Sequence, residues 1–423
     1  MTALTTARDR EAAEIIKGND RSGYTVPTRG LYPFQWNWDS CLVALGWARI
    51  DEDRAWTEIE TLFSAQWPDG MVPHIVFHRP DPGYFPGPER WGTGRTPPTS
   101  GITQPPVAAS CVRRILEGAA DGGMAERRAR ALLPKLLAYH RWFHSVRDPD
   151  GEGIVSVLHP WETGMDNSPA WDEALGRVEV AADLEAYVRR DTQHVNASMR
   201  PTKAEYDRYM TLVGFFRTRG WRHEITGASP FRVADVGLNC ILMRADRDLL
   251  ALAQRFGDDT AAAEIEGWIE RSERAFGLFV DPATGMWHSI DQVAGGRVPA
   301  ATHAGFLAFW AGRGDGRLLA LLEAWIAKTR YAVASTAADD PRFDAIRYWR
   351  GPIWAIANFM VGEGLRQSGH DGIARRIRAD TRELIDRGGF YEYFDPRDGA
   401  PCGGGSFTWT AAMWLAWAGS EPG

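Results

Sequence analysis

WDSCLVALGWARI (residues 38–50) and AWTEIETLFSAQ (residues 55–66) flank Asp51 and decide the fold class of this chain. In both stretches, apolar residues recur at the three- and four-residue spacing of an amphipathic helix. The polar residues around Asp51 are a turn signal between them. The two stretches therefore predict a helical hairpin.

Further pairs of this kind follow along the chain, and strand signals are scarce. They are residues 105–118 with 125–146, 233–256 with 261–279, 301–312 with 317–328, and 352–367 with 373–388. With a weaker helix at 205–219 and a last helix at 407–419, the chain holds about six hairpins. Helix pairs stack as an open solenoid or close into a ring.

The segments that join these helices favour the closed ring. They are long, rich in Gly, Pro and Trp, and the hairpins share no sequence repeat. Such loops suit one functional rim of a closed structure. We expect an all-α fold, an (α/α)6 toroid forming a single domain over residues 1–423. Rim loops at about 68–104 and 191–209 are expected to form a partial lid.

The composition is globular and excludes several classes of partner. Of the 423 residues 44% are hydrophobic and 24% charged, the formal net charge is −7 at pH 7, and no run of Lys and Arg exceeds an adjacent pair. The basic surface that nucleic acid requires is therefore missing. No apolar segment is long enough to span a membrane or to act as a signal peptide. We expect a cytoplasmic protein with no nucleic-acid or membrane partner.

The four cysteines, Cys41, Cys111, Cys240 and Cys402, lie far apart without CxxC spacing, so we expect buried thiols. Several motifs that resemble metal-binding or phosphate-binding sites are incomplete. Residues 148–153 begin like a calcium loop, but its twelfth position is His159 rather than Glu. The histidines lack HxH and HExxH spacing, and the run Gly403 to Gly405 lacks the Lys of a phosphate loop and predicts a flexible connection. We expect neither metal nor cofactor.

The tryptophans point to a sugar ligand. Many of the 19 stand in polar company, as in FQWNWD with Trp36 and Trp38, and in HPWET with Trp161. Aromatic faces stack on the C–H faces of sugars, while neighbouring polar groups bind the hydroxyls. Core packing is the alternative for any single tryptophan.

Two acidic segments are candidates for catalysis. In HPWETGMDNSPAWDEAL (residues 159–175), Asp166 follows a flexible Gly-Met pair and lies in a turn that can direct its side chain into a cavity. A turn-stabilising Asx role is the alternative. Asp172 and Glu173 are typical of a helix N-terminus.

In the second segment, GGFYEYFDPRDG (residues 388–399), aromatic neighbours of Glu392 would raise its pKa and suit a base. The alternative is a β-hairpin that exposes Glu392 and turns at residues 395–399. Two carboxylates from distant loops are what glycoside hydrolysis requires.

Other loops supply polar and aromatic groups for a sugar site. LYPFQWNWDS (residues 31–40) offers Tyr32 and Asp39, and Asp39 either accepts two sugar hydroxyls or caps the helix that begins there. Tyr84 lies on a Pro-Gly loop, and Gln104 precedes a helix. RYWRGPIW adds Tyr348, Trp349 and Arg350.

These motifs together resemble the bacterial members of glycoside hydrolase family 63, among them the hydrolases of glucosylglycerate and mannosylglycerate. The resemblance runs in order through LYPFQWNWDS, GYFPGPERW, SGITQPP, HPWETGMDNSPAWD, YWRGPIW and FYEYFDPRDG. It implies the (α/α)6 toroid and an inverting mechanism, with Asp166 as general acid and Glu392 as general base.

The resemblance also implies a sugar subsite lined by Tyr32, Trp38, Asp39, Tyr84, Gln104, Tyr348 and Trp349. SMRPTKAEYDRYM (residues 198–210) is similar to a mobile loop that closes over glycerate, which makes Arg200 and Tyr206 candidates for holding a carboxylate. A solvated loop charge is the alternative for Arg200.

The expected function is hydrolysis of a small α-glucoside or α-mannoside. The resemblance implies that this substrate is glucosylglycerate, and also mannosylglycerate, and that the products are free sugar and glycerate. The expected partner is that small molecule. Another short α-glucoside as substrate, a sugar epimerase using His74, His159 or His194, and a non-catalytic sugar-binding protein are the alternatives. The sequence leaves assembly into homo-oligomers open.

Overall fold

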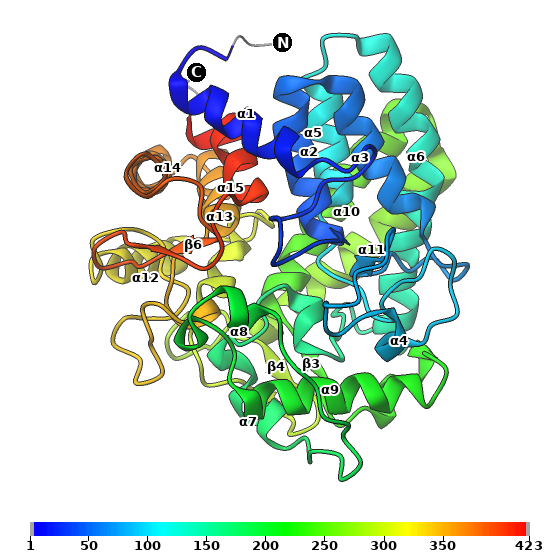
Figure 1. Cartoon of the computed structure of the whole chain (residues 1–423). Helices are drawn as coiled ribbons and strands as arrows, with labels where there is room; N and C mark the ends of the chain where they lie inside the picture. Colours follow the sequence, from blue (N-terminus) through cyan, green and yellow to red (C-terminus); the bar gives the residue numbers. More distant parts are fainter. Residues whose placement is uncertain (1–3, 420–423) are drawn as a thin grey trace.

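The computed structural model describes residues 4–419, and most of these residues are helical (Figure 1). The longer helices are α1 (Ala7–Asn19), α2 (Asn37–Ile50), α3 (Glu52–Ser64), α5 (Ala108–Glu117), α6 (Gly122–Trp142), α9 (Lys203–Arg217), α10 (Val236–Phe256), α11 (Asp259–Ala275), α12 (Gly316–Ile326), α13 (Ala355–Gln367) and α14 (Asp371–Gly388). The shorter ones are α4 (Pro88–Trp91), α7 (Asp172–Gly176), α8 (Asp191–His194) and α15 (Thr408–Met413). Within residues 4–419, no helix is both long and apolar enough to cross a membrane.

Aspartates start the second helix of most hairpins, as the Asp-rich turns predict. The side chain of Asp51 accepts a hydrogen bond from Arg54 N at 3.1 Å, at the start of α3. Asp121 caps α6 and Asp258 caps α11 in the same way, each from the residue before the helix. Such a cap satisfies one of the free N–H groups of the first turn, so these short turns fix where each hairpin reverses.

The first helix of each hairpin lies inside and the second outside. In α2 every residue from Asn37 to Trp47 is buried, and in α13 every residue from Ala355 to Leu365. A helix that is covered on all sides belongs to the interior of a protein. By contrast, α3 and α14 bury one face each and expose the other.

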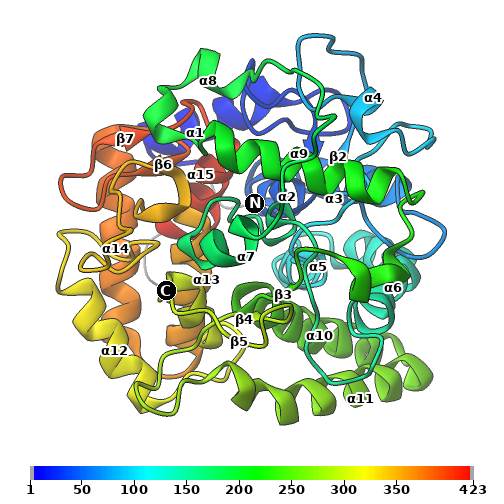
Figure 2. The ribbon, with the colours of Figure 1, turned by 90° about the horizontal axis from the view of Figure 1, so that it is seen from below.

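Contacts between the inner segments form a closed cycle, seen from below in Figure 2. Helix α2 packs against α5, α5 against α10, and α10 against the short 3-10 helix η7 (His303–Ala308). Helix η7 then packs against α13, α13 against α15, and α15 against α2. The N-terminal helix α1, which the sequence analysis does not assign, packs on α15 and α2.

Residues 301–312 do not form the predicted α-helix. Only the 3-10 helix η7 forms there, and turns follow it. A side chain at Gly305 would place its Cβ 2.5 Å from the carbonyl oxygen of Trp287, and Gly312 has a φ of +66°. The close approach at one position and the left-handed backbone at the other both require glycine, which disfavours an α-helix through this segment.

A buried ionic cluster lies between α6 and α10. Asp246 accepts hydrogen bonds from His140 at 2.7 Å and from His144 at 3.0 Å, and all three side chains are buried. Burial alone would raise the pKa of Asp246, but the two histidines hold it at about 2. The cluster therefore links two layers of helix inside the protein through a charged group.

The strands are two residues long and lie in the connecting segments. β1 (Gln35–Trp36) pairs antiparallel with β2 (Ile75–Val76), and β6 (Tyr393–Phe394) with β7 (Pro401–Cys402). The third sheet has the order β3 (Val233–Ala234), β4 (Ile290–Asp291), β5 (Gly296–Arg297). In β6–β7, Tyr393 lies opposite Cys402, so the predicted hairpin after Glu392 is present.

The long connecting segments gather at one end of the molecule, in the lower part of Figure 1, together with α4, α7, α8 and α9. They carry the 3-10 helices η2 (Pro160–Thr163), η3 (Pro169–Trp171), η4 (Ala197–Met199), η5 (His223–Ala228), η6 (Phe276–Phe279) and η8 (Tyr348–Arg350). Single π-helical turns, η1 (Phe143–Arg147) and η9 (Trp414–Ala418), extend α6 and α15.

Two of the connecting segments are tied to each other. The rings of Phe85 and Tyr187 stack with centroids 4.6 Å apart, and Arg190 pairs with Asp81 at 2.8 Å.

Candidate active site

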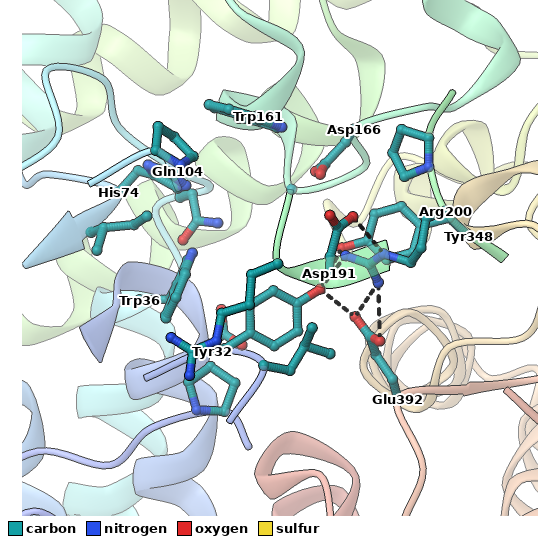
Figure 3. A pocket seen from close by; sticks show the side chains of 18 of the residues that line it. Tyr32, Trp36, His74, Gln104, Trp161, Asp166, Asp191, Arg200, Tyr348 and Glu392 are labelled. Atoms are coloured by element: carbon teal, nitrogen blue, oxygen red, sulfur yellow. Dashed lines mark hydrogen bonds and ion pairs between the residues drawn. The ribbon is translucent and has the colours of Figure 1, made fainter. Parts of the chain in front are cut away.

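A pocket at the end that holds the connecting segments contains nearly all of the residues that the sequence analysis selects (Figure 3). The predicted residues that line it are Tyr32, Trp36, Trp38, Asp39, Tyr84, Gln104, Trp161, Asp166, Arg200, Tyr206, Tyr348 and Glu392. They come from the segment that leads into α2 and its first turn, from the loops around α4 and η2, from α9 and the segment before it, from η8, and from the position directly before β6. Residues distant in sequence therefore meet in one aromatic, acidic cavity.

Asp166 lies between η2 and η3 in a tight loop. Gly164 precedes it with a φ of +70°, and a Cβ there would lie 2.5 Å from Trp38, so this loop packs directly on the pocket wall. The carbonyl oxygen of Asp166 accepts a hydrogen bond from the Tyr209 hydroxyl at 2.8 Å. Burial raises the pKa of Asp166 to about 7, although the Arg200 guanidinium acts in the opposite direction. A carboxyl group with this pKa can carry a proton near neutrality.

Glu392 lies on the opposite side of the pocket, directly before β6, and is buried rather than exposed. Its Oε1 accepts from the Tyr32 hydroxyl at 3.0 Å and its Oε2 from Gly404 N at 3.1 Å. Arg200 donates to both oxygens, at 3.3 and 3.2 Å. Burial raises the pKa of Glu392, and these donors oppose that rise by favouring the ionised form.

The glycine run after Glu392 has a packing role, not only that of a flexible connection. Gly403 has a φ of +73°, and a Cβ at this position would lie 2.4 Å from Oε2 of Glu392. The backbone N–H of the next residue, Gly404, donates the hydrogen bond to Oε2 of Glu392. The absence of a side chain at Gly403 lets the backbone approach the carboxylate this closely.

Arg200 joins the groups around Glu392 into one network. Besides Glu392, it donates to Asp191 at 3.2 Å and to the Tyr32 hydroxyl, and it lies over the Tyr348 ring at 4.2 Å from the centroid. Burial alone would raise the pKa of Asp191, but Arg189 and Arg200 hold it below its ordinary value. Arg200 is buried and paired, so it is not the solvated loop charge of the alternative interpretation.

The other walls carry aromatic and polar side chains. Asp39 lies in the first turn of α2, but Trp36 is the capping residue, so Asp39 does not cap the helix. Burial raises the pKa of Asp39 well above its ordinary value. His74 stacks on Trp161 with ring centroids 6.0 Å apart, and Oε1 of Gln104 accepts from Trp38 N at 3.3 Å.

Trp349 is the one predicted substrate contact that does not line the pocket. It is buried behind the wall, where its ring stacks on Trp354 with centroids 3.7 Å apart. Its backbone N–H donates to Oδ1 of Asn167 at 3.1 Å. Although Trp349 follows the pocket residue Tyr348, its ring packs in the core, where most large aromatic rings are buried.

Several pocket residues are not among the predicted contacts. Asp191, Arg190, Phe85 and Trp409 also line the cavity, as does His74. Asp191 and Arg190 lie in or beside a segment selected as a lid loop, and His74 lies in the other lid loop. The long connecting segments could therefore be selected from the sequence. No local pattern, however, distinguishes Asp191 from the other carboxylates in these loops.

The remaining acidic and basic candidates have structural partners. Glu162 accepts from Leu158 N at 2.7 Å and pairs with the buried Arg147. Asp172 begins α7, as predicted, and pairs with Arg350 at 2.9 Å.

The segment that begins like a calcium loop is closed by its own hydrogen bonds. The Asp148 carboxylate accepts from the N–H groups of Glu152 and Gly153, both at 2.8 Å, which closes that turn on itself. All four cysteines are free and buried, as predicted, and no cluster of three metal-ligating side chains occurs among residues 4–223 and 227–419.

The site has the parts that glycoside hydrolysis needs: aromatic walls, one carboxyl group with a pKa near neutrality, and a second one surrounded by donors. Comparison with known proteins gives the same class. A family model for the mannosylglycerate hydrolase MGH1-like glycoside hydrolase domain matches residues 32–410. The chain belongs to this family of glycoside hydrolases.

Individual relatives cover almost the whole chain. Mannosylglycerate hydrolase MGH1 of Selaginella moellendorffii is 53% identical over 410 residues, covering 96% of this chain and 84% of the relative. Glucosylglycerate hydrolase of Mycolicibacterium hassiacum is 35% identical, over 96% and 97% of the two chains. The crystal structure of the GH63 mannosylglycerate hydrolase from Thermus thermophilus in complex with Tris and D-glycerate aligns with a TM-score of 0.94. It is 49% identical and covers 97% of this chain and 99% of that one.

Proposed function

We propose that this enzyme hydrolyses mannosylglycerate or glucosylglycerate to the free sugar and glycerate, with inversion at the anomeric carbon. The observation that carries the proposal is the difference between the two buried carboxyl groups. Asp166 has a pKa of about 7, whereas Glu392 faces Arg200, Tyr32 and a backbone N–H, all of which favour its ionised form. The first suits a proton donor and the second a proton acceptor.

In the proposed reaction, Asp166 gives its proton to the glycosidic oxygen as the bond to the anomeric carbon breaks. Glu392 removes a proton from a water molecule, whose oxygen bonds to that carbon from the opposite face of the ring. Glycerate leaves with the proton from Asp166, and the sugar is released as the β-anomer. Proton transfer from Glu392 back to Asp166 through solvent restores the enzyme.

The proposed sugar subsite comprises Tyr32, Trp36, Trp38, Asp39, Tyr84, Gln104, Trp161 and Tyr348. Asp39 lines the pocket and does not serve as a helix cap, so its carboxyl group is available to bind sugar hydroxyls. Trp38 and Trp161 offer ring faces for stacking.

For the aglycone, we propose that Arg200 and Tyr206 bind the glycerate carboxylate. Arg200 suits a carboxylate because its planar guanidinium carries several donors, and one of them, Nη1, already donates to both oxygens of Glu392. The Thermus thermophilus relative was crystallised with D-glycerate, which is consistent with such an aglycone.

We also propose that the closed cycle of helix contacts is an (α/α)6 toroid and that residues 1–423 form one catalytic domain. Segments 68–104 and 191–209 would act as its lid. A contact between the two segments supports this proposal, because the rings of Phe85 and Tyr206 lie with their centroids 6.4 Å apart.

The decisive experiment compares Asp166→Asn and Glu392→Gln with the wild type on mannosylglycerate and glucosylglycerate. Each variant should lose at least about a hundredfold in kcat, the lower range for a general acid or base. Asp398→Asn, in the exposed turn of the same hairpin, is the matched control and should keep full activity.

NMR of the first product should detect the β-anomer. Release of the α-anomer would contradict inversion, and failure on both glycerate compounds by the wild type would remove the substrate assignment. Activity retained by either variant would take that residue out of its role.

A further inference from the structure

Tyr209 of α9 holds both ends of the loop that carries the proposed general acid. Its hydroxyl donates to the carbonyl oxygen of Asp166 at 2.8 Å, and its own carbonyl oxygen lies 3.1 Å from Nε2 of His159. The side chain is fully buried and stands behind the pocket wall rather than in it. One residue of the helix therefore spans the loop from position 159 to position 166.

The contacts at the His159 end fix its role as structural. Its Nδ1 accepts from Trp161 N at 3.0 Å, so Nε2 carries the proton that is donated to Tyr209. Burial lowers the pKa of His159 to about 3, which keeps the ring neutral and preserves this pattern. His159 is thus not free for the acid–base chemistry of an epimerase.

The same helix also reaches the substrate side of the pocket. Tyr206, one turn before Tyr209, lines the cavity, and the two rings lie 5.8 Å apart. Residues three apart on a helix share a face, so both rings press on Trp161 from α9, at 5.6 and 5.5 Å. A capping box formed by Thr202 and Glu205 fixes the start of α9 directly after Arg200.

We infer that Tyr209 is a positioning residue for the general acid. Tyr209 couples the position of α9 to the orientation of the Asp166 carboxyl group. The inference rests on the proposed function of Asp166. The Tyr209 hydroxyl anchors the main chain of Asp166 itself, and a shift of that anchor tilts the side chain away from the glycosidic oxygen. Small errors in the geometry of a catalytic group have large effects on rate.

The test is Tyr209→Phe, which removes one oxygen and leaves the ring in place. Two substrates separate positioning of the acid from general damage: mannosylglycerate, whose leaving oxygen needs a proton, and α-mannosyl fluoride, whose fluoride leaves without one. We expect kcat on mannosylglycerate to fall about tenfold, the factor for one ordinary hydrogen bond. Hydrolysis of the fluoride should stay within about twofold of wild type.

A second variant removes the other contact. His159→Asn keeps a side-chain oxygen that can accept from Trp161 N, as a good N-cap does. Its amide N–H2 group lies closer to the main chain than Nε2 of histidine, so the hydrogen bond to the Tyr209 carbonyl is lost. It should also lose activity selectively on mannosylglycerate. Tyr187→Phe is the matched control, because that hydroxyl bonds Asp207 on the outer part of the same helix and should leave both rates unchanged.

Equal losses on both substrates, or no loss on either, in Tyr209→Phe would overturn the inference. If that variant does not fold, the same two outcomes in His159→Asn decide. Asp166→Asn separates the inference from the proposed function: it should lose mannosylglycerate hydrolysis and keep the fluoride reaction. If Asp166→Asn keeps both, the role of Asp166 fails, and the positioning role of Tyr209 fails with it.

Discussion

Replacing Arg200 by glutamine should raise the pKa of Glu392 further and move the acidic limb of the pH–rate profile upward. The Arg200 guanidinium lies 3.3 and 3.2 Å from the two oxygens of Glu392, and both side chains are buried. It is the nearest cation to a carboxylate that burial already disfavours. Loss of that charge makes ionisation of Glu392 still less favourable.

The expected size follows from the strength of this contact. A hydrogen bond to a charged group contributes about 1.5–3 kcal/mol. One pKa unit corresponds to about 1.4 kcal/mol. The pKa of Glu392 should therefore rise by about 1–2 units, while Tyr32 and Gly404 continue to donate. Glu392 must be ionised to accept a proton from water. The acidic limb of the pH–rate profile should therefore move to higher pH by the same amount as the pKa of Glu392.

The assay is kcat/KM for α-mannosyl fluoride as a function of pH. This substrate has no carboxylate, so weaker binding of glycerate by the variant does not distort the profile. Arg190→Gln is the matched control, since Arg190 lines the same pocket but pairs with Asp81 at 2.8 Å. An acidic limb in Arg200→Gln that stays in place, or that moves to lower pH, would refute the reasoning.

Three further predictions concern other parts of the molecule. On mannosylglycerate, kcat/KM should fall above a midpoint near pH 7, because Asp166 has a pKa of about 7 and must be protonated; a profile that is flat through neutrality would contradict this. Gly403→Ala should cost about 1–2 kcal/mol through its φ of +73° and displace Glu392, lowering both Tm and kcat. Gly405→Ala, whose nearest contact would be 3.4 Å, should resemble wild type, and equal effects of the two would argue against the close approach. Asp246→Asn should lower the free energy of unfolding by about 3–5 kcal/mol in urea, without changing KM, and unchanged stability would show that the buried cluster is dispensable.

Most of the fold could be predicted because its signals are local. Apolar spacing marks the helices, and the capping aspartates Asp51, Asp121 and Asp258 mark where hairpins reverse. The prediction of an α-helix over residues 301–312 was wrong because the helical spacing of its apolar residues competes with the backbone conformation at Gly305 and Gly312. What makes Gly305 necessary is the carbonyl of Trp287, which no local pattern reveals.

The sequence identified some residues of the site correctly and missed others. Asp166 and Glu392 each had an ordinary turn role as an alternative, and only the resemblance to a family favoured acid and base. Asp191 was not selected, although Arg200 pairs with it in the pocket. Trp349 was selected but turns into the core.

The helical hairpins, the class of enzyme and the two acidic loops could be predicted from the amino-acid sequence, because they depend on residues close together in the chain or on motifs shared with relatives. The tertiary structure decided which carboxyl group faces which neighbour. Burial raises the pKa of Asp166 to about 7, and Arg200, Tyr32 and Gly404 surround Glu392. Desolvation and Coulomb attraction depend on distance in space, and these groups meet only when the chain is folded.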